Sequence, residues 1–187
     1  MTVKIAMIGA GWVCEARHLP ALRRLRHAEV VGIVDPDESR ARAVAAKFGI
    51  PHVSTASSAG DIPWLAEASA VCISPPPRHH HAWMAACLDL GKDVLIEKPL
   101  ALTRAEAEDL DRRVQARGVM ACVMHNTLFS RSSIRARLLL ADGAIGPLSA
   151  IQIRLLNSPR RHLPDWYENL PFKLLYNKLS HFLYQNN

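Results

Sequence analysis

Short, uninterrupted apolar runs recur along this chain, with helix-patterned segments between most of them. The runs cover residues 3–8, 30–34, 70–73, 94–96 and 120–124. A strand with one face in solvent alternates apolar and polar residues, whereas a strand buried on both faces does not. The continuous apolarity therefore predicts an α/β fold built on a doubly wound parallel sheet, with helices on each side.

The segments between these runs carry signals for further elements. The interval from Asp35 to Ala70 leaves room for a helix and one more strand, although the segment at His52 and Val53 is too short for a firm strand prediction. Helix ends are marked by N-capping residues, glycines and a capping box. The expected helices run from Asp37 or Ser39 to Gly49, from the box at residues 103–106 to near Gly118, and over residues 130–141.

The first apolar run leads directly into a glycine-containing turn, Gly9-Ala10-Gly11-Trp12-Val13, followed by a helix-like segment. Gly9 permits a tight turn, and Gly11 lets backbone N–H groups approach a pyrophosphate without an intervening Cβ. The helix N-terminus adds a partial positive charge. The order of strand, turn and helix predicts that these five residues form a dinucleotide-binding cradle, although Cys14 replaces the third glycine of the usual G-x-G-x-x-G pattern.

The second apolar run ends at Asp35, 24 positions beyond Gly11. This is close to the roughly 20-residue spacing expected for the acid that bonds the adenosine ribose. A carboxylate bonds a free 2′-hydroxyl and repels a 2′-phosphate, so Asp35 predicts NAD. Arg40 leaves NADP possible if it turns toward the ribose, but its place on a helix predicts a solvent-facing side chain. In the plainer alternative, Asp35 only starts a turn and the glycines only form a tight loop.

Composition narrows the functional class. The chain has 187 residues, 49% of them hydrophobic, and a formal net charge of +6. Its arginines are dispersed over separate helix-like segments without interleaved aromatic residues, which argues against nucleic-acid binding. No apolar run reaches the roughly 18 residues of a membrane helix, and no cleavage site follows the first run. These features predict a cytoplasmic chain without a membrane partner.

The cysteines and the consecutive histidines also suggest specific chemistry. Four scattered cysteines form no C-x-x-C pair and are expected to be reduced core thiols. Cys14 could be reactive because a helix N-terminus lowers a thiol pKa, but core packing is the simpler interpretation. The side chains of His79, His80 and His81 diverge by about 100° each on a helix, so we expect no metal site there.

A second motif, Glu97-Lys98-Pro99, follows the run at residues 94–96. Together with the N-terminal turn, it resembles the Gfo/Idh/MocA oxidoreductase family. The resemblance also includes residues 74–77 (Ser-Pro-Pro-Pro), His81 at a helix start and residues 142–146, and it is good over roughly the first 155 residues.

The resemblance implies a dehydrogenase that transfers a hydride between a nicotinamide cofactor and a sugar, inositol or related polyol. It implies a Rossmann domain followed by an α/β domain, and a homo-oligomer in the full-length form. In the family, the lysine of the Glu-Lys-Pro triplet lies beside the nicotinamide, and an Asp-x-x-x-His motif supplies an acid/base histidine. These positions correspond to Lys98 and to Asn177 with His181 here, so the acid of the second motif is replaced.

The same roles can be argued from chemistry. Removal of a hydride from a carbinol carbon requires a base for the hydroxyl proton and a cation for the developing alkoxide. We expect Lys98 and His181 to be the catalytic residues, with Glu97 able to tune the charge of Lys98. The expected cofactor-binding residues are Gly9, Ala10, Gly11, Trp12, Val13, Asp35, Ser74, Pro75, His81, Glu97, Lys98 and Asn126.

The chain is expected to contain a Rossmann domain over residues 1–125 and an incomplete second domain over residues 126–187. Residues 148–155 are expected to form one strand of a half-exposed sheet, and composition shifts from residue 172 onward, which suggests truncation or a foreign segment. An incomplete sheet predicts aggregation, association or folding of the first domain alone. Two other functions remain open: a non-catalytic NAD(P)-binding regulator or remnant, and a methyltransferase with a similar glycine turn.

Overall fold

The computed structural model describes residues 2–152. The chain divides into two units, Met1–Met124 and His125–Asn187, a division one residue before the expected domain boundary. In the described residues, no helix is long and apolar enough to cross a membrane.

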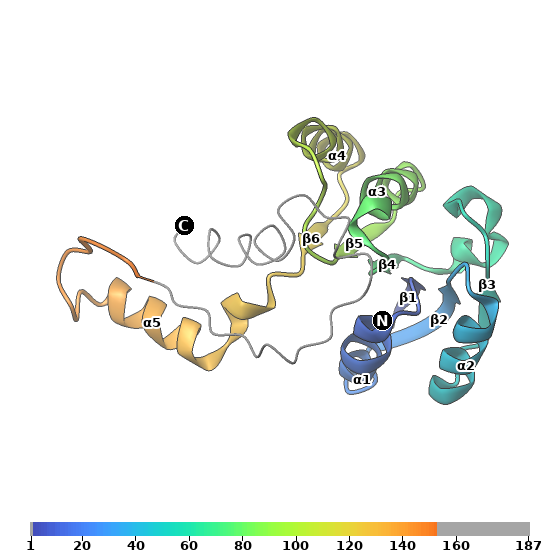
Figure 1. Cartoon of the computed structure of the whole chain (residues 1–187), viewed down its shortest axis with the longest axis horizontal. Helices are drawn as coiled ribbons and strands as arrows, with labels where there is room; N and C mark the ends of the chain where they lie inside the picture. Colours follow the sequence, from blue (N-terminus) through green and yellow to red (C-terminus); the bar gives the residue numbers. More distant parts are fainter. Residues whose placement is uncertain (1, 153–187) are drawn as a thin grey trace, which may run out of the picture. The chain divides into compact units, whose positions relative to one another are not determined.

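The first unit is built on a six-stranded sheet with the order β3-β2-β1-β4-β5-β6 (Figure 1). Every neighbouring pair of strands is parallel. This confirms the predicted doubly wound α/β fold, including the additional strand that the sequence left uncertain. The strands are β1 Val3–Ile8, β2 Ala28–Val34, β3 His52–Ser54, β4 Ala70–Ile73, β5 Asp93–Ile96 and β6 Ala121–Val123.

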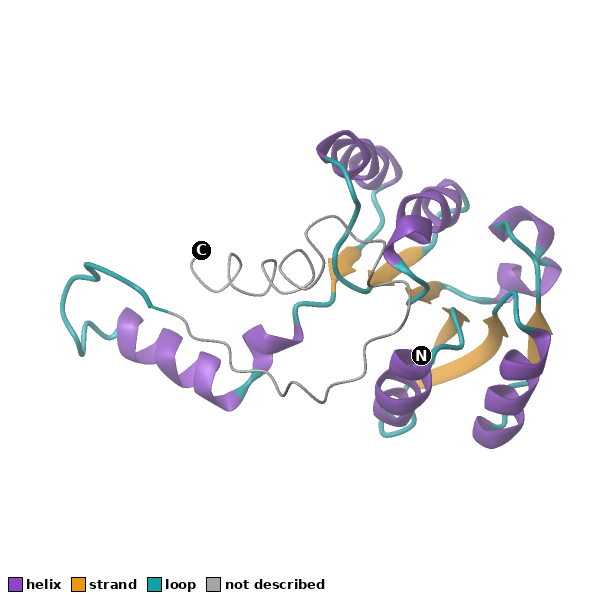
Figure 2. Cartoon of the chain, in the orientation of Figure 1, coloured by secondary structure: helices purple, strands orange, loops and turns teal. Residues whose placement is uncertain are grey.

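Helices and short helical turns connect these strands (Figure 2). The α-helices of the first unit are α1 Leu19–Leu22, α2 Glu38–Phe48, α3 His80–Asp89 and α4 Arg104–Arg117. A π-helix, η1 Cys14–His18, precedes α1 directly. The 3₁₀ turns of this unit are η2 Ala59–Asp61, η3 Pro63–Glu67 and η4 Pro77–His79.

The helices cover both faces of the sheet, α1 and α2 on one side and α3 and α4 on the other (Figure 1). Successive side chains of a strand point to opposite faces. Met7 accordingly packs in a core with Leu19 and Val44, whereas its neighbour Ile8 packs in a core with Met84 and Leu110. The continuous apolarity of β1 is thus explained by burial on both sides.

The strand order reverses at β1 and β4, and this reversal positions the site. Ile8 pairs with Val34 of β2 on one side and with Ile73 of β4 on the other. The residues that follow these strands, Gly9, Asp35 and Ser74, therefore emerge at one edge of the sheet. Ligands of open α/β sheets bind at this carboxyl edge, in the crevice where the strand order reverses.

Local sequence signals account for the helix ends. Asp37 Oδ1 accepts the Arg40 amide hydrogen at 3.0 Å and caps α2, which ends at Gly49 with φ +72°. Thr103 and Glu106 form the expected capping box at the start of α4, and Gly118 ends that helix in the left-handed conformation. These ends confirm the predictions made from the caps and glycines.

The expectation of burial is wrong for the last strand. Met120, just before β6, is 73% exposed, and Cys122 is exposed as well. Strand β6 is the edge of the sheet, and α1 and α2 extend only over β1 to β3 on their side. An apolar groove of about 480 Å³ lies along this part of the sheet and is lined by residues that include Leu22, Cys72 and Leu95.

The described part of the second unit consists of the 3₁₀ turn η5 Asn126–Phe129 and the helix α5 Arg131–Ala141. Ser130 caps α5 by accepting the Ser133 amide hydrogen at 3.1 Å. Residues 148–152, the described part of the strand expected over residues 148–155, have no regular secondary structure. Residues 153–155 and the tail from residue 172 lie outside the described residues.

Candidate functional site: a dinucleotide cradle at the carboxyl edge of the sheet

The turn after β1 is fixed by the conformation and close packing of Gly9. Its φ of +95° lies in a region that side-chain-bearing residues rarely adopt. A Cβ added to Gly9 would lie 2.8 Å from Pro75 N and 2.9 Å from Ser74 C. The Gly9 amide donates to Val34 O at 2.7 Å. Only glycine therefore allows β1, β2 and the Ser74–Pro75 segment to meet at this turn.

Gly11 has a different role, because packing does not explain the glycine. A Cβ added there would have no protein atom within 4 Å. The helical turn begins at the next residue, Trp12, and the first N–H groups of a helix have no partners within the helix. Trp12 is 66% exposed. Open space thus lies next to Gly11 at the start of a helix, as the cradle interpretation requires.

Asp35 connects the end of β2 to this turn. Its side chain is 6% exposed, and the Ala10 amide donates to its Oδ2 at 2.7 Å. Its Oδ1 accepts the Asp37 amide hydrogen at 2.9 Å. Asp35 does begin a turn, as the plainer interpretation holds, but it also fixes the backbone of the glycine turn from 25 residues away.

Arg40 is exposed, as its place on a helix predicts, but its guanidinium also takes the alternative direction toward the end of β2. Although the side chain is 47% exposed, its guanidinium turns toward Asp35 and donates from Nη2 to Oδ1 at 2.6 Å. Its Nη1 also lies 3.6 Å from Asp37 Oδ2. This hydrogen bond with Asp35 raises the pKa of Arg40 and places the cation beside the carboxylate expected to contact the adenosine ribose. A long side chain near the start of a helix can turn back to the preceding strand end.

The segment after β4 forms the other wall of the crevice. The Ser74 amide donates to Ile8 O at 2.8 Å, and its hydroxyl lies 3.3 Å from both Ile8 O and Gly9 O. His80, which is 1% exposed, has Nε2 at 3.0 Å from Pro75 O and Nδ1 at 2.6 Å from Pro99 O. Burial lowers the pKa of His80. This histidine connects the segments that follow β4 and β5.

The expected cleft histidine, His81, has a different environment. Its Nε2 lies 3.0 Å from Asp109 Oδ2, and the same carboxylate accepts a hydrogen bond from Arg113 at 2.8 Å. His79 instead lies 3.0 Å from the Arg78 guanidinium. The three imidazoles thus have three separate sets of partners. Cofactor contact by His81 stays a prediction, and sequence alone did not identify His80.

The Glu97-Lys98-Pro99 motif lies at the end of β5. The Glu97 amide donates to Ile73 O at 2.8 Å, which extends the pairing of β4 with β5. Its carboxylate accepts from the Lys98 amide at 3.3 Å and faces His18 Nε2 at 3.1 Å. Burial would raise the pKa of Glu97, but the hydrogen bond and charge of His18, with Lys98, lower it below its usual value. No local sequence pattern points to His18, because its partner lies 79 positions away.

Cys14 is a core residue. It is 0% exposed, and burial, reinforced by the charges of Asp35 and Glu15, raises the pKa of its thiol to about 12. The thiol is therefore protonated at neutral pH and not nucleophilic. This confirms the core interpretation for Cys14, and Cys72 and Cys87 are buried too, whereas Cys122 is exposed.

Two expected site residues fall beyond the first unit. Asn126 is the first residue of η5 in the second unit. His181 lies outside the described residues, as does Asn177. Their expected roles stay predictions.

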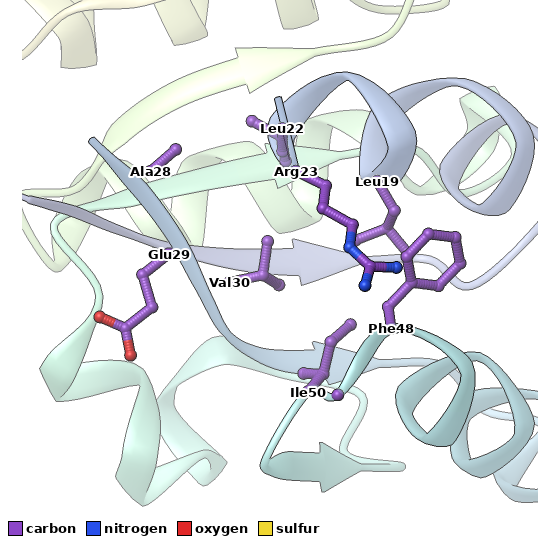
Figure 3. A pocket seen from close by; sticks show the side chains of 9 residues that line it. Leu19, Leu22, Arg23, Ala28, Glu29, Val30, Phe48 and Ile50 are labelled. Carbon is purple, nitrogen blue, oxygen red and sulfur yellow. The ribbon is translucent and has the colours of Figure 1, made fainter. Parts of the chain in front are cut away.

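A separate small pocket lies away from this edge. It has a volume of about 250 Å³ and is lined by residues at the start of β2, before β3, and on α1 and the end of α2 (Figure 3). Since these are the amino ends of the strands, the pocket is not part of the crevice. Among residues 2–152, no group of three His, Cys, Asp or Glu side chains is arranged to hold a metal ion.

The residues of the crevice fit a dinucleotide. The open space at Gly11 would accept a pyrophosphate. Asp35 stands at the end of β2, where a Rossmann fold bonds the adenosine ribose. Glu97 and Lys98 follow β5, on the far side of the point where the strand order reverses, where the nicotinamide half of a dinucleotide would extend.

Comparison with known proteins agrees with this geometry. Residues 3–125 match the family model GFO_IDH_MocA, described as an oxidoreductase family with an NAD-binding Rossmann fold. The chain is 32% identical to inositol 2-dehydrogenase 1 of Saccharopolyspora erythraea over 179 residues, covering 92% of this chain and 50% of that protein.

Solved structures show the same fold. A 3-ketoreductase from Actinomadura kijaniata in complex with NADP matches with a TM-score of 0.68 and 29% identity, covering 78% of this chain and 46% of that one. Scyllo-inositol dehydrogenase from Lactobacillus casei with bound NAD(H) and scyllo-inositol matches with a TM-score of 0.72 and 22% identity, over 78% and 43% of the chains. The chain spans about half the length of the relatives it matches.

Proposed function

Since this chain belongs to the Gfo/Idh/MocA oxidoreductase family, we propose that it forms the cofactor-binding part of an NAD-dependent dehydrogenase. The substrate class is a sugar, an inositol or a related polyol. Relatives named as an inositol dehydrogenase and a sugar reductase support this class. We assign the enzyme to the cytoplasm, where unpaired, scattered thiols remain reduced.

In this proposal, the pyrophosphate lies over the amide groups of residues 9–13, and the adenosine ribose contacts Asp35. The observation that carries the proposal is the unfilled space at Gly11, at the start of a helix and beside a turn fixed by Asp35. Packing requires a glycine at position 9 but not at position 11. A ligand that needs close approach to the backbone accounts for Gly11.

The nicotinamide half extends past the reversal of strand order toward Ser74, Pro75, Glu97 and Lys98. The chemistry that NAD supplies when bound is acceptance of a hydride from a carbinol carbon. Lys98 steadies the developing alkoxide with its positive charge, and His181 removes the hydroxyl proton. Asn177 cannot orient the histidine through a charge, so we expect slower proton transfer than an aspartate at this position would allow.

Asp35 and Arg40 together set the preference between the two dinucleotides. The carboxylate favours the free 2′-hydroxyl of NAD. The guanidinium, fixed 2.6 Å from this carboxylate, offsets part of the repulsion of a 2′-phosphate. We therefore propose that NAD is preferred and that NADP is bound more weakly.

The test is titration of the 187-residue chain with NAD, NADP and S-adenosylmethionine by calorimetry, followed by assays with a panel of sugars and inositols. Binding of NAD with hydride transfer from at least one sugar or inositol of the panel to NAD supports the dehydrogenase. Binding of NAD with no transfer to any panel member supports the regulator instead. Binding of S-adenosylmethionine but not NAD would support the methyltransferase alternative and contradict the proposal.

A further inference from the structure

The helix that follows the glycine turn begins with an irregular turn. Residues 14–18 form the π-helix η1, in which the Leu19 amide bonds Cys14 O, five residues back. Pro20 follows within the first turn of α1. Proline has no N–H and its ring crowds the carbonyl four residues earlier, which explains why the chain widens here. A π-helical turn contains about one residue more than an α-helical turn, so the direction in which the His18 side chain leaves the helix is changed.

The inward-facing His18 reaches a residue 79 positions away. Its Nε2 lies 3.1 Å from Glu97 Oε1. The two side chains are 9% and 18% exposed, so this pair is largely shielded from water. The contact passes over β4, since η1 follows β1 and Glu97 follows β5. It connects the helix of the proposed pyrophosphate cradle with the motif on the opposite side of the crevice.

Glu97 is held at both carboxylate oxygens. Oε1 faces His18, and Oε2 accepts the Lys98 amide hydrogen at 3.3 Å. The hydrogen bond and charge of His18 keep this largely buried carboxylate ionised against the opposing effect of burial. Without His18, Glu97 would lose this hydrogen bond while its carboxylate stayed largely buried, so more of the cost of desolvation would be left uncompensated.

We propose that His18 is a positioning residue for the nicotinamide half of the dinucleotide site. It fixes the carboxylate of Glu97 and, through it, the backbone of Lys98. The inference rests on the proposed dinucleotide function and deepens it. Asp35 and Ala10, at the end of the crevice expected to bind adenosine, are connected by a separate hydrogen bond. Binding of the adenosine half of the dinucleotide should therefore not depend on His18.

The experiment compares binding of NADH and ADP by the full chain with His18→Leu, His18→Gln and the wild type. Leucine removes the hydrogen bond, whereas the glutamine amide can still donate to Glu97. We expect His18→Leu to weaken NADH binding about tenfold, the order expected for a lost hydrogen bond to a charged group, and to change ADP binding less than about twofold. His18→Gln should bind NADH within about threefold of the wild type.

A purely structural role would give a different result. If His18→Leu weakens NADH and ADP binding equally, or leaves both unchanged, the inference is overturned. In a Glu97→Ala background, His18→Leu should have no further effect on NADH binding, and an additive loss would also overturn it. If the wild type binds NADH no more tightly than ADP, the proposed function itself fails and the inference fails with it.

A measurement on the wild type does not depend on whether the variants fold. Imidazole ¹⁵N NMR should show a protonated Nε2 on His18 that is hydrogen-bonded to a carboxylate, and Glu97→Gln should shift this signal. An Nε2 signal that does not respond to Glu97→Gln would show that the two side chains are not coupled in solution and would overturn the inference.

Discussion

The Ala10 amide donates a hydrogen bond of 2.7 Å to Asp35 Oδ2, which joins the glycine turn after β1 to the end of β2. Through this bond, the residue expected to bind the adenosine ribose also shapes the backbone expected to bind the pyrophosphate. In the proposed function, recognition of the sugar and of the phosphates would thus depend on the same carboxylate.

Asp35→Ala should therefore impair both binding and stability. It leaves the buried Ala10 N–H without its acceptor and removes the nearer of the two carboxylates that face Arg40. We expect a loss of about 1–3 kcal/mol in unfolding free energy and at least about a tenfold loss of NAD affinity. Denaturant titration and calorimetry measure the two effects.

Thr103→Ala is the matched control for Asp35→Ala. It removes the capping box of α4 and should cost about 1 kcal/mol of stability without weakening NAD binding. Equal effects of Thr103→Ala and Asp35→Ala on NAD affinity would contradict the dual role of Asp35.

Arg40→Ala should change the cofactor preference. Without the guanidinium, the 2′-phosphate of NADP would face the Asp35 carboxylate unscreened, so NADP affinity should fall about five- to tenfold more than NAD affinity. Arg42→Ala is the control, because Arg42 pairs with Glu38 on the same helix and is exposed. If Arg40→Ala and Arg42→Ala change the NADP-to-NAD ratio equally, the assignment is wrong.

Gly9→Ala should destabilise the first unit. The added Cβ would lie within 3 Å of the backbone of Ser74 and Pro75, at a φ that favours glycine. We expect a cost of at least about 1–3 kcal/mol and a loss of NAD binding. Gly32→Ala provides a contrast, because its Cβ would overlap the Trp64 ring and lower stability without touching the crevice. If NAD binding falls equally in both variants, the loss results from unfolding and not from a change in the crevice.

The pKa of Glu97 predicts a pH dependence of stability. Since this pKa is lower in the folded chain than in the unfolded chain, the unfolded state binds the proton more readily. The resulting stabilisation is present above the unfolded pKa of about 4.3 and is lost as the pH falls through the folded value. Glu97→Gln should remove this contribution, so the difference in unfolding free energy between wild type and variant should be larger at neutral pH than at about pH 3. A difference in unfolding free energy that does not change with pH would contradict a stabilising role of the ionised Glu97 carboxylate.

The sequence predicted the elements whose signals are local. Apolar runs identified five strands, and caps such as Thr103 and glycines such as Gly49 marked helix ends because these residues satisfy backbone groups within a few positions. Gly9 and Asp35 were identified because a Rossmann turn requires them at a known spacing.

The remaining features depend on contacts that no local pattern specifies. The His18–Glu97 pair requires the strand order and the π-helical turn together. His80 rather than His81 reaches the strand ends because one residue of helix register rotates a side chain by about 100°. The exposure of Met120 reflects which elements cover the sheet, and its apolar sequence resembles that of a buried strand.

Calorimetric titration of Gly11→Ala with NAD tests the central claim most directly. Its added Cβ would meet no protein atom, so the unfolding free energy should stay within about 0.5 kcal/mol of the wild type. Gly60→Ala, with no atom nearer than Ser58 Oγ at 4.0 Å, is the control. We predict that the wild type and Gly60→Ala bind NAD with the same affinity. Gly11→Ala should bind NAD at least about tenfold more weakly, because the added Cβ would displace the pyrophosphate from one backbone hydrogen bond. Undiminished binding by Gly11→Ala, or no binding by the folded wild type, would contradict a pyrophosphate resting on this turn.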